Sequence, residues 1–337
     1  MTKLLCDPSD IVHLRHILVC SVFVAAGAVL FYLGSFPWWV AAAYLVVWGV
    51  VAERFTMMYH CTIHRRLFKK QYWFLDAYLS WILCPFFGQT PGSFYIHHMG
   101  MHHIDDNLPL DLSSTMKYQR DNAFHFVRYY LRFALLIPFE LSVYFWRNHN
   151  KELLRNFLVG EIAFYLLCIG LGLWHLQPTI VVFVIPFCFV RFMMMVGNWA
   201  QHAFVDPDAP DNDYKSSVNT IYKPYNDRLF NAGYHIFHHV RKGTHYSDLP
   251  TEFEQNRETY GRQDAIVFDG IDLFAIWVLL LARRHATLAK YFVRLPGAPV
   301  RTNEEVIALF KRRLAPIRGW TLPPEAAARR PTFVPMS

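Results

Sequence analysis

Four long apolar segments set the main constraint on the fold of this chain. They cover residues 17–34, 38–58, 157–175 and 179–199. Each has close to the roughly 20 helical residues that cross a hydrocarbon layer of about 30 Å. Because a membrane interior offers no water to free backbone groups, such segments cross it as helices. The sequence therefore predicts an all-α integral membrane protein with four transmembrane helices.

Short connections arrange these segments as two hairpins. The connections at residues 35–37 and 176–178 are uncharged and too short for anything but a tight turn. The long loops at residues 64–70, 147–155 and 215–242 carry the lysines and arginines. Since cationic loops stay in the cytoplasm, we expect both termini and these loops on that side. The prediction is a multi-pass protein with a cytoplasmic cap.

Three other apolar stretches are short or interrupted by charged residues. They cover residues 73–87, 124–146 and 266–281. We interpret them as interfacial amphipathic helices. A count of six spans is the alternative. We expect one membrane domain over residues 1–317 and a loose tail, rich in proline and alanine, over residues 318–337.

The overall composition agrees with a membrane protein. Hydrophobic residues make up 54% of the chain and charged residues only 18%. The formal net charge of +7 is explained by cytoplasmic loops, so it does not predict binding of nucleic acid.

Nine of the 17 histidines gather at or near the ends of apolar segments. These nine are His60, His64, His98, His102, His103, His202, His235, His238 and His239. One structural zinc takes four ligands, so nine histidines fit two metal ions better. Imidazole ligands suit iron, copper, zinc or nickel. Histidines that merely cap helices at the interface are the simpler alternative, but four clusters on one predicted face argue against it.

Helical spacing indicates which histidines share a metal ion. Residues four apart lie on one helical face, so His60 and His64 converge. By the same rule His98, rather than its neighbour His97, shares an ion with His102. His103 is rotated by about 100° and can reach a second ion. Asn198 lies one turn before His202, where its amide can hold a metal-bound water.

The order HxxxH, HxxxHH and HxxHH around two hairpins resembles the membrane fatty acid desaturase superfamily over roughly residues 15–285. The Asn198–His202 pair is similar to a fourth element of acyl-CoA desaturases. The first two boxes depart from those enzymes in spacing by one residue each. Residues 102–107, 111–121 and 263–270 look like the bacterial enzymes that decarboxylate fatty acids to terminal alkenes.

The resemblance implies a non-haem diiron oxidase that uses O2 and activates a C–H bond of a fatty acyl chain. Its substrate would be a fatty acid or a fatty acyl-CoA. Electrons would come from a separate carrier such as ferredoxin or cytochrome b5. Imidazoles also retain zinc, so zinc can replace the two iron ions during purification. Desaturation is the first expectation, while decarboxylation to a 1-alkene and hydroxylation are alternatives.

A second class of function is a histidine-rich membrane metal transporter. Transport requires polar groups distributed through the spans. The clustering of histidines at one predicted membrane face favours the oxidase.

Two charged residues inside the spans are candidates for function. Arg191 shares a helical face with Asn198 and His202, and Glu161 lies at a matching depth on the preceding span. Either they form an ion pair that holds the hairpin, or Arg191 orients a substrate carboxylate.

Four carboxylates are candidates for holding the ligand histidines. Glu53 precedes His60 by two helical turns, and Asp105, Asp106 and Asp111 follow the second box. A carboxylate that accepts a hydrogen bond from a ligand histidine fixes the tautomer and orientation of the ring. For Glu53, a pair with Arg54 is the alternative.

Overall fold

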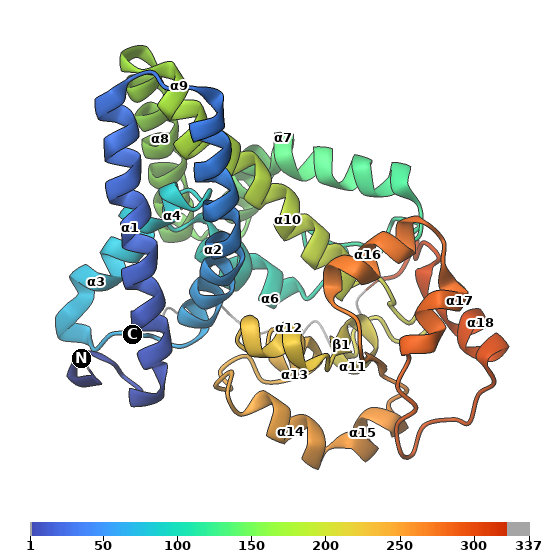
Figure 1. The fold of residues 1–337 in the computed structure, drawn as a ribbon. Coiled ribbons are helices and arrows are strands. Elements are labelled where there is room, and N and C mark those ends of the chain that lie inside the picture. Colours follow the sequence, from blue (N-terminus) through green and yellow to red (C-terminus); the bar gives the residue numbers. More distant parts are fainter. Residues whose placement is uncertain (1, 322–337) are drawn as a thin grey trace. The chain divides into compact units, whose positions relative to one another are not determined.

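The computed structural model describes residues 2–321 and is mainly helical (Figure 1). The described residues form two compact units. The first unit contains the residues up to Gly100 and Pro138–Met193, and the second contains Met101–Ile137 and the residues from Met194 onward. Most of the tail predicted over residues 318–337 lies outside the described residues. The single domain expected over residues 1–317 stays a prediction.

Within residues 2–321, four helices are long and apolar enough to cross a membrane, which confirms the predicted number of spans. They cover Pro8–Leu33, Trp38–His64, Lys151–Trp174 and Leu176–Gln201. Helix α1 (Ile11–Leu33) and helix α2 (Trp38–His64) form the first hairpin. Helix α8 (Lys151–Trp174) is followed by α9 (Leu176–Thr179), a π-helical turn (Ile180–Val184) and α10 (Ile185–Gln201). The second and fourth spans therefore extend beyond their predicted ends.

The turns of the two hairpins lie side by side within the first unit (Figure 1), and two hydrogen bonds join them. The backbone N–H of Phe36 donates to Gln177 Oε1 at 2.9 Å, and Gln177 Nε2 donates to the Phe36 carbonyl at 2.7 Å. Gly34 has a φ of +68°, and a side chain there would collide with the ring of His175. These contacts satisfy backbone groups where the chain leaves the helices.

Further helices connect the spans. The stretch at residues 73–87 is helical in three pieces: α3 (Trp73–Tyr78), a π turn (Leu79–Leu83) and α4 (Cys84–Phe86). The second histidine box follows as α5 (Ser93–His97), a π turn (His98–His102) and α6 (His103–Asp105). Helix α7 (Ala123–Arg147) contains Pro138.

The rest of the second unit consists of short elements. They are α11 (Asp213–Ser216), β1 (Val218–Thr220), α12 (Lys223–Arg228), α13 (His235–Val240), α14 (Leu249–Gln255), α15 (Arg257–Arg262), β2 (Ile266–Phe268), α16 (Leu273–Leu281), α17 (His285–Leu288) and α18 (Asn303–Leu314). An apolar core of α13, α14, α15 and β2 residues includes Ile236, Phe253, Tyr260 and Val267.

One predicted helix is partly wrong. Residues 266–281 begin with strand β2, which pairs in parallel with β1 in the register Val218 to Ile266. Gly270, at a φ of +75°, then turns the chain, and the Asp272 side chain caps α16. The buried sequence Ile-Val-Phe favours a strand, and the Asp-Gly that follows favours a turn.

A buried arginine at the end of α18 anchors this helix to the rest of the second unit. Arg313 Nη2 lies 3.0 Å from Asp206 Oδ2 and 3.2 Å from Asp264 Oδ2. Burial alone would raise the pKa of Asp206, but the charges of Arg313 and its neighbours Arg312 and Lys215 lower it below its ordinary value. The ionised pair is therefore the state that the fold stabilises.

Replacing Arg313 by Met should destabilise the protein most at neutral pH. Removing one partner of a buried ion pair costs about 3–5 kcal/mol. The pKa of Asp206 is lower in the folded protein than in the unfolded chain. Its contribution to the stability of the fold is therefore present above the ordinary Asp pKa of about 4, and it disappears as the pH falls through the pKa of the folded state. The difference in melting temperature between wild type and Arg313→Met should become smaller as the pH is lowered. Lys311→Met, on the exposed side of α18, is the control. A difference in melting temperature that does not depend on pH would contradict the ion pair between Arg313 and Asp206.

Candidate metal centre

The first unit brings together three histidines by their Nε2 atoms. His60 and His64 lie on α2, and His98 begins the π turn after α5. His98 Nε2 lies 2.8 Å from His60 Nε2 and 3.0 Å from His64 Nε2. One ring nitrogen thus faces two others, which is the arrangement of ligands around a common ion.

The second unit brings together four buried histidines. His102, His202 and His239 form a group whose ligand nitrogens lie within 4.8 Å of one another. His235 belongs to it as well, since its Nε2 lies 3.2 Å from His202 Nε2 and 3.0 Å from His239 Nε2. His102 ends the π turn, His202 directly follows α10, and His235 and His239 lie on α13, so segments far apart in the sequence meet here.

The remaining two histidines form a pair in the second unit. His103 Nε2 lies 3.0 Å from His238 Nε2. Lys242 Nζ donates a hydrogen bond to the carbonyl of His103. This bond joins the end of the second histidine box to the loop after α13.

Acceptors behind three rings decide which ring nitrogen is the ligand. His102 Nδ1 lies 2.7 Å from Asp111 Oδ2, and His202 Nδ1 lies 3.0 Å from the Ser216 carbonyl. His239 Nδ1 bonds to Asp106 Oδ1. Each acceptor requires a proton on Nδ1, so Nε2 of the neutral ring keeps its lone pair.

These lone pairs face one another and therefore fit a cation. A single proton on His235 Nε2 could satisfy either His202 or His239, but not both. Two nitrogens that each lie about 2.0–2.1 Å from one ion are about 2.9–3.4 Å apart in octahedral or tetrahedral geometry. The observed separations of 3.0 and 3.2 Å agree with this range. The residues present thus fit a transition metal ion.

Burial keeps these ligands in the form that binds metal. It lowers the pKa of His202 and of His239, so both rings are neutral at pH 7. Burial would raise the pKa of Asp106, but its hydrogen-bonded partner His239 lowers it overall. Burial and the charge of Asp106 raise the pKa of Asp213. Asp106 and Asp213 thus form a pair of carboxyl groups, in which Asp106 is the ionised member.

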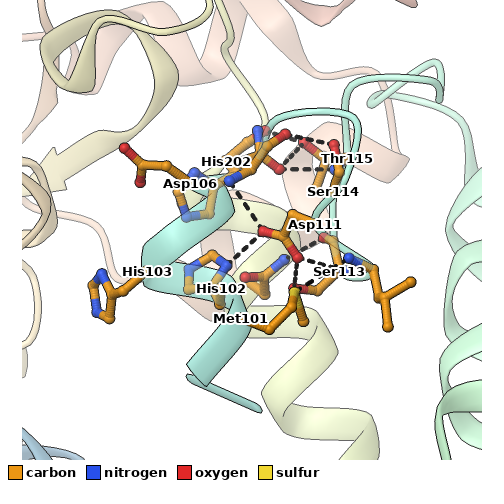
Figure 2. Close-up of polar contacts among 12 residues, drawn as sticks. Met101, His102, His103, Asp106, Asp111, Ser113, Ser114, Thr115 and His202 are labelled. Atoms are coloured by element: carbon orange, nitrogen blue, oxygen red, sulfur yellow. Dashed lines mark hydrogen bonds and ion pairs between the residues drawn. The ribbon is translucent and has the colours of Figure 1, made fainter. Parts of the chain in front are cut away.

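Asp111 is held by donors on every side (Figure 2). Besides His102, it accepts from the backbone N–H groups of Asn107 at 3.0 Å and Ser113 at 2.7 Å. The hydroxyl of Ser113 adds a fourth bond at 2.6 Å. Thr115 of the same loop donates its hydroxyl hydrogen to the backbone carbonyl of His202 at 2.5 Å. The loop thus orients two ligand histidines of one group.

The comparison with protein families decides what kind of site this is. The family model for fatty acid desaturases matches residues 36–270, which is more than half of the chain. This chain belongs to the fatty acid desaturase family. Neither a curated protein sequence nor a solved structure matches it. As a desaturase-family protein with four spans, it is a multi-pass membrane oxidoreductase that acts on fatty acyl chains.

The histidines of this desaturase-family chain are grouped differently from the expectation based on helical spacing. His98 contacts His60 and His64, not the group that contains His102. Residues His98–His102 form a π turn rather than a regular α-helix, and the two histidines at its ends belong to different groups. In α13, which is a regular α-helix, His235 and His239 do meet as the spacing predicts.

The carboxylates named from the sequence have different positions. Asp106 and Asp111 each bond to a ligand histidine. Asp105 is buried, and its carbonyl accepts from the Leu108 N–H. Glu53 is exposed on α2. The assignment of Asp105 and Glu53 to the metal site stays a prediction.

Asn198 bonds to the Asp111 loop and to α7. Its Nδ2 donates to the Ser113 carbonyl at 3.0 Å and to the Tyr129 hydroxyl at 2.7 Å. Both amide hydrogens are used in this way, so only Oδ1 remains for a metal-bound water. That role stays a prediction.

Arg191 and Glu161 contact each other within the first unit. Arg191 Nη2 lies 3.4 Å from Glu161 Oε1, and the guanidinium lies over the Phe187 ring at 4.1 Å. Glu161 also accepts from the hydroxyls of Thr90 and Ser93. This geometry supports an ion pair that holds the hairpin more than a free arginine that awaits a carboxylate.

Three polar contributors to the site were not identified from the sequence. They are the Ser216 carbonyl, Asp213 and Lys242. A backbone acceptor leaves no signal in the sequence. Asp213 and Lys242 lie in two charged segments of the sequence, where nothing distinguishes them from solvated charges.

Replacing Asp111 by Asn should weaken metal binding by about 10–100-fold, as the loss of similar outer partners does. The amide keeps the size of the side chain but removes the charge, and its NH2 group must face other donors. Iron per purified chain, measured in a chelator competition, tests this. Asp227→Asn, an exposed change on α12, is the control. Equal retention of iron by wild type and Asp111→Asn would show that Asp111 does not support the ligand.

Proposed function

We propose that this chain is an O2-dependent membrane oxidase that holds two iron ions and oxidises a fatty acyl chain. The observation that carries the proposal is the convergence of Nε2 atoms in both units, with ring tautomers fixed by Asp111, Asp106 and the Ser216 carbonyl. Two bound iron ions would supply the activation of O2 and the removal of hydrogen from an unactivated C–H bond.

The protein contributes ligand orientation and exclusion of water. His102, His202 and His239 are each at most 2% exposed, so the second group is shielded from bulk solvent. Shielding of this kind protects a reactive centre from side reactions. The nine imidazoles carry no negative charge, which leaves the bound ions strongly electrophilic. Apolar residues of the spans would surround the alkyl chain.

Desaturation is the proposed reaction, because it is the activity for which the matching family is described. Removal of a second hydrogen from the neighbouring carbon gives the double bond. Decarboxylation of a free fatty acid to a 1-alkene and CO2 is the second candidate, and it is favoured by the local likeness of residues 102–107 and 111–121. Hydroxylation requires oxygen transfer to the same carbon and is the third outcome.

Product analysis separates these reactions. Purified, iron-loaded protein receives an electron donor, O2 and a saturated C12–C18 acid or its CoA ester. An unsaturated product of unchanged length supports desaturation. A terminal alkene one carbon shorter in the headspace supports decarboxylation, and an alcohol supports hydroxylation. If metal exchanges readily and no substrate stimulates O2 uptake, the oxidase proposal is wrong and a metal transporter is the better reading.

We also propose that the termini and the metal groups face the cytoplasm, where a ferredoxin or cytochrome b5 would deliver electrons. The support is the cationic character of the loops between the hairpins. Labelling of an introduced cysteine at exposed Lys223 in sealed vesicles tests the orientation. Labelling only by membrane-permeant reagents in right-side-out vesicles supports the cytoplasmic position of residue 223. Equal labelling by impermeant reagents would place this residue on the opposite side of the membrane.

A further inference from the structure

A pocket in the second unit lies against the loop that holds His102. Its volume is about 330 Å³, which is at the lower end of small-molecule sites. The loop Pro109–Lys117, Arg132 of α7 and the segment Ile317–Trp320 line it. Asp111 is one of the lining residues, so a single side chain links the pocket wall to a ligand histidine.

The charged residues of the pocket are unbalanced. Lys117, Arg132 and Arg318 are cationic, whereas Asp111 is the one carboxylate among the lining residues. The oxygens of Asp111 already accept hydrogen bonds from His102, Asn107 and Ser113, and its single negative charge is outnumbered by the three cations. The pocket therefore presents a net positive surface to an occupant.

One cation is fixed in the wall and another is available at the rim. Arg132 Nη1 donates to the Leu112 carbonyl at 3.0 Å, which anchors its guanidinium at the pocket. Arg318 is exposed and forms no ion pair or hydrogen bond with any residue between 2 and 321. Guanidinium groups bind carboxylates and phosphates with two parallel hydrogen bonds.

The other walls of the pocket are apolar. Ile317 and Trp320 pack against a buried cluster of Leu108, Met116 and Val205. The side chains of Leu112, Met116, Ile317 and Trp320 thus border the cationic groups. A surface that combines cations with apolar walls matches a molecule that has an anionic head and a hydrocarbon chain.

We propose that this pocket binds the anionic head of an acyl amphiphile, with Lys117, Arg132 and Arg318 contacting the head and Trp320 contacting the first carbons. The inference rests on the proposed function only for the identification of the amphiphile as a substrate. A carboxylate head would mean that a free fatty acid enters head-first beside the His102 loop. A phosphate head would mean an acyl-CoA or a lipid.

Photoaffinity labelling tests the pocket directly, without turnover. Wild-type protein in nanodiscs of neutral phosphatidylcholine receives a C16 chain with a diazirine near its head. The head is a carboxylate, a phosphate or a methyl ester. We expect the anionic probes to label peptides containing residues 109–117 or 317–320, with weaker labelling at high salt. The preferred anion identifies the head. Equal labelling by the methyl ester, or labelling elsewhere, would overturn the inference.

Matched variants separate the pocket from the catalytic proposal. Lys117→Gln combined with Arg318→Gln should raise the probe concentration for half-maximal labelling about tenfold. Arg284→Gln combined with Lys311→Gln removes the same charge at exposed positions outside the pocket and should leave labelling unchanged. Unaltered labelling of the variant with Lys117→Gln and Arg318→Gln would overturn the pocket proposal. Iron content and O2 uptake test the oxidase proposal separately. Labelling without O2 uptake leaves the pocket standing and counts against the oxidase.

Discussion

Replacing His202 by Ala should abolish activity and remove metal from the second unit. His202 is fully buried, its Nε2 lies 3.2 Å from that of His235, and its Nδ1 is held by the Ser216 carbonyl. Loss of an outer partner alone typically weakens metal sites by about 10–100-fold, so loss of a ligand should reduce turnover by at least about 100-fold. Elemental analysis of iron and substrate-dependent O2 consumption measure the two effects.

A histidine outside the groups provides the control for this variant. His149 is exposed and has a φ of +54°, a conformation that Asn tolerates well. His149→Asn should therefore retain iron and turnover. Size-exclusion profiles distinguish loss of the metal from loss of the fold. Full iron content and full turnover in His202→Ala would exclude His202 as a ligand.

Replacing Arg120 by Met should have the largest effect on stability. The Arg120 side chain is completely buried in the second unit, and its hydrogen bonds within residues 2–321 all go to backbone carbonyls. Its shortest bonds reach Ala203 at 2.6 Å, Arg313 at 2.6 Å and Ala315 at 2.7 Å. Burial lowers the pKa of Arg120, yet a guanidinium remains protonated at neutral pH. Methionine would leave these buried acceptors without donors, at a cost of about 3–5 kcal/mol.

Thermal unfolding of the solubilised protein measures this loss. Arg120→Lys keeps the charge but not the planar fork, so its melting temperature should fall between those of wild type and Arg120→Met. Arg284→Met, at an exposed position, should have the same melting temperature as wild type. A melting temperature of Arg120→Met equal to that of wild type would mean that the carbonyls find other donors.

The spans and the histidine clusters could be predicted because both follow from local patterns. Hydrophobic length predicts a transmembrane helix, and the spacing of His235 and His239 predicts their shared face. The regrouping of His98 could not be predicted, since a π turn at Gly100 and Met101 depends on tertiary packing. A side chain at position 100 would meet Leu153 at 2.8 Å, which is a contact with a distant part of the sequence.

The polar network of the second unit was also beyond prediction. Arg120 reads as an ordinary loop charge, and its partners are backbone carbonyls of residues near 203 and 314. The parallel pairing of β1 and β2 likewise joins segments that are each only three residues long. Interactions of this kind depend on which segments become neighbours, and sequence periodicity carries no information on that point.

A metal ion bound by the four-histidine group of the second unit would also affect how much protein a cell contains. The members of this group come from the π turn, from the residue after α10 and from α13, so a bound ion would act as a cross-link between distant segments of a newly made chain. Free energy of metal binding then becomes free energy of folding. A chain that is inserted before it receives metal would open more often and be degraded faster. Iron supply during synthesis should therefore set the abundance of the protein as well as its activity.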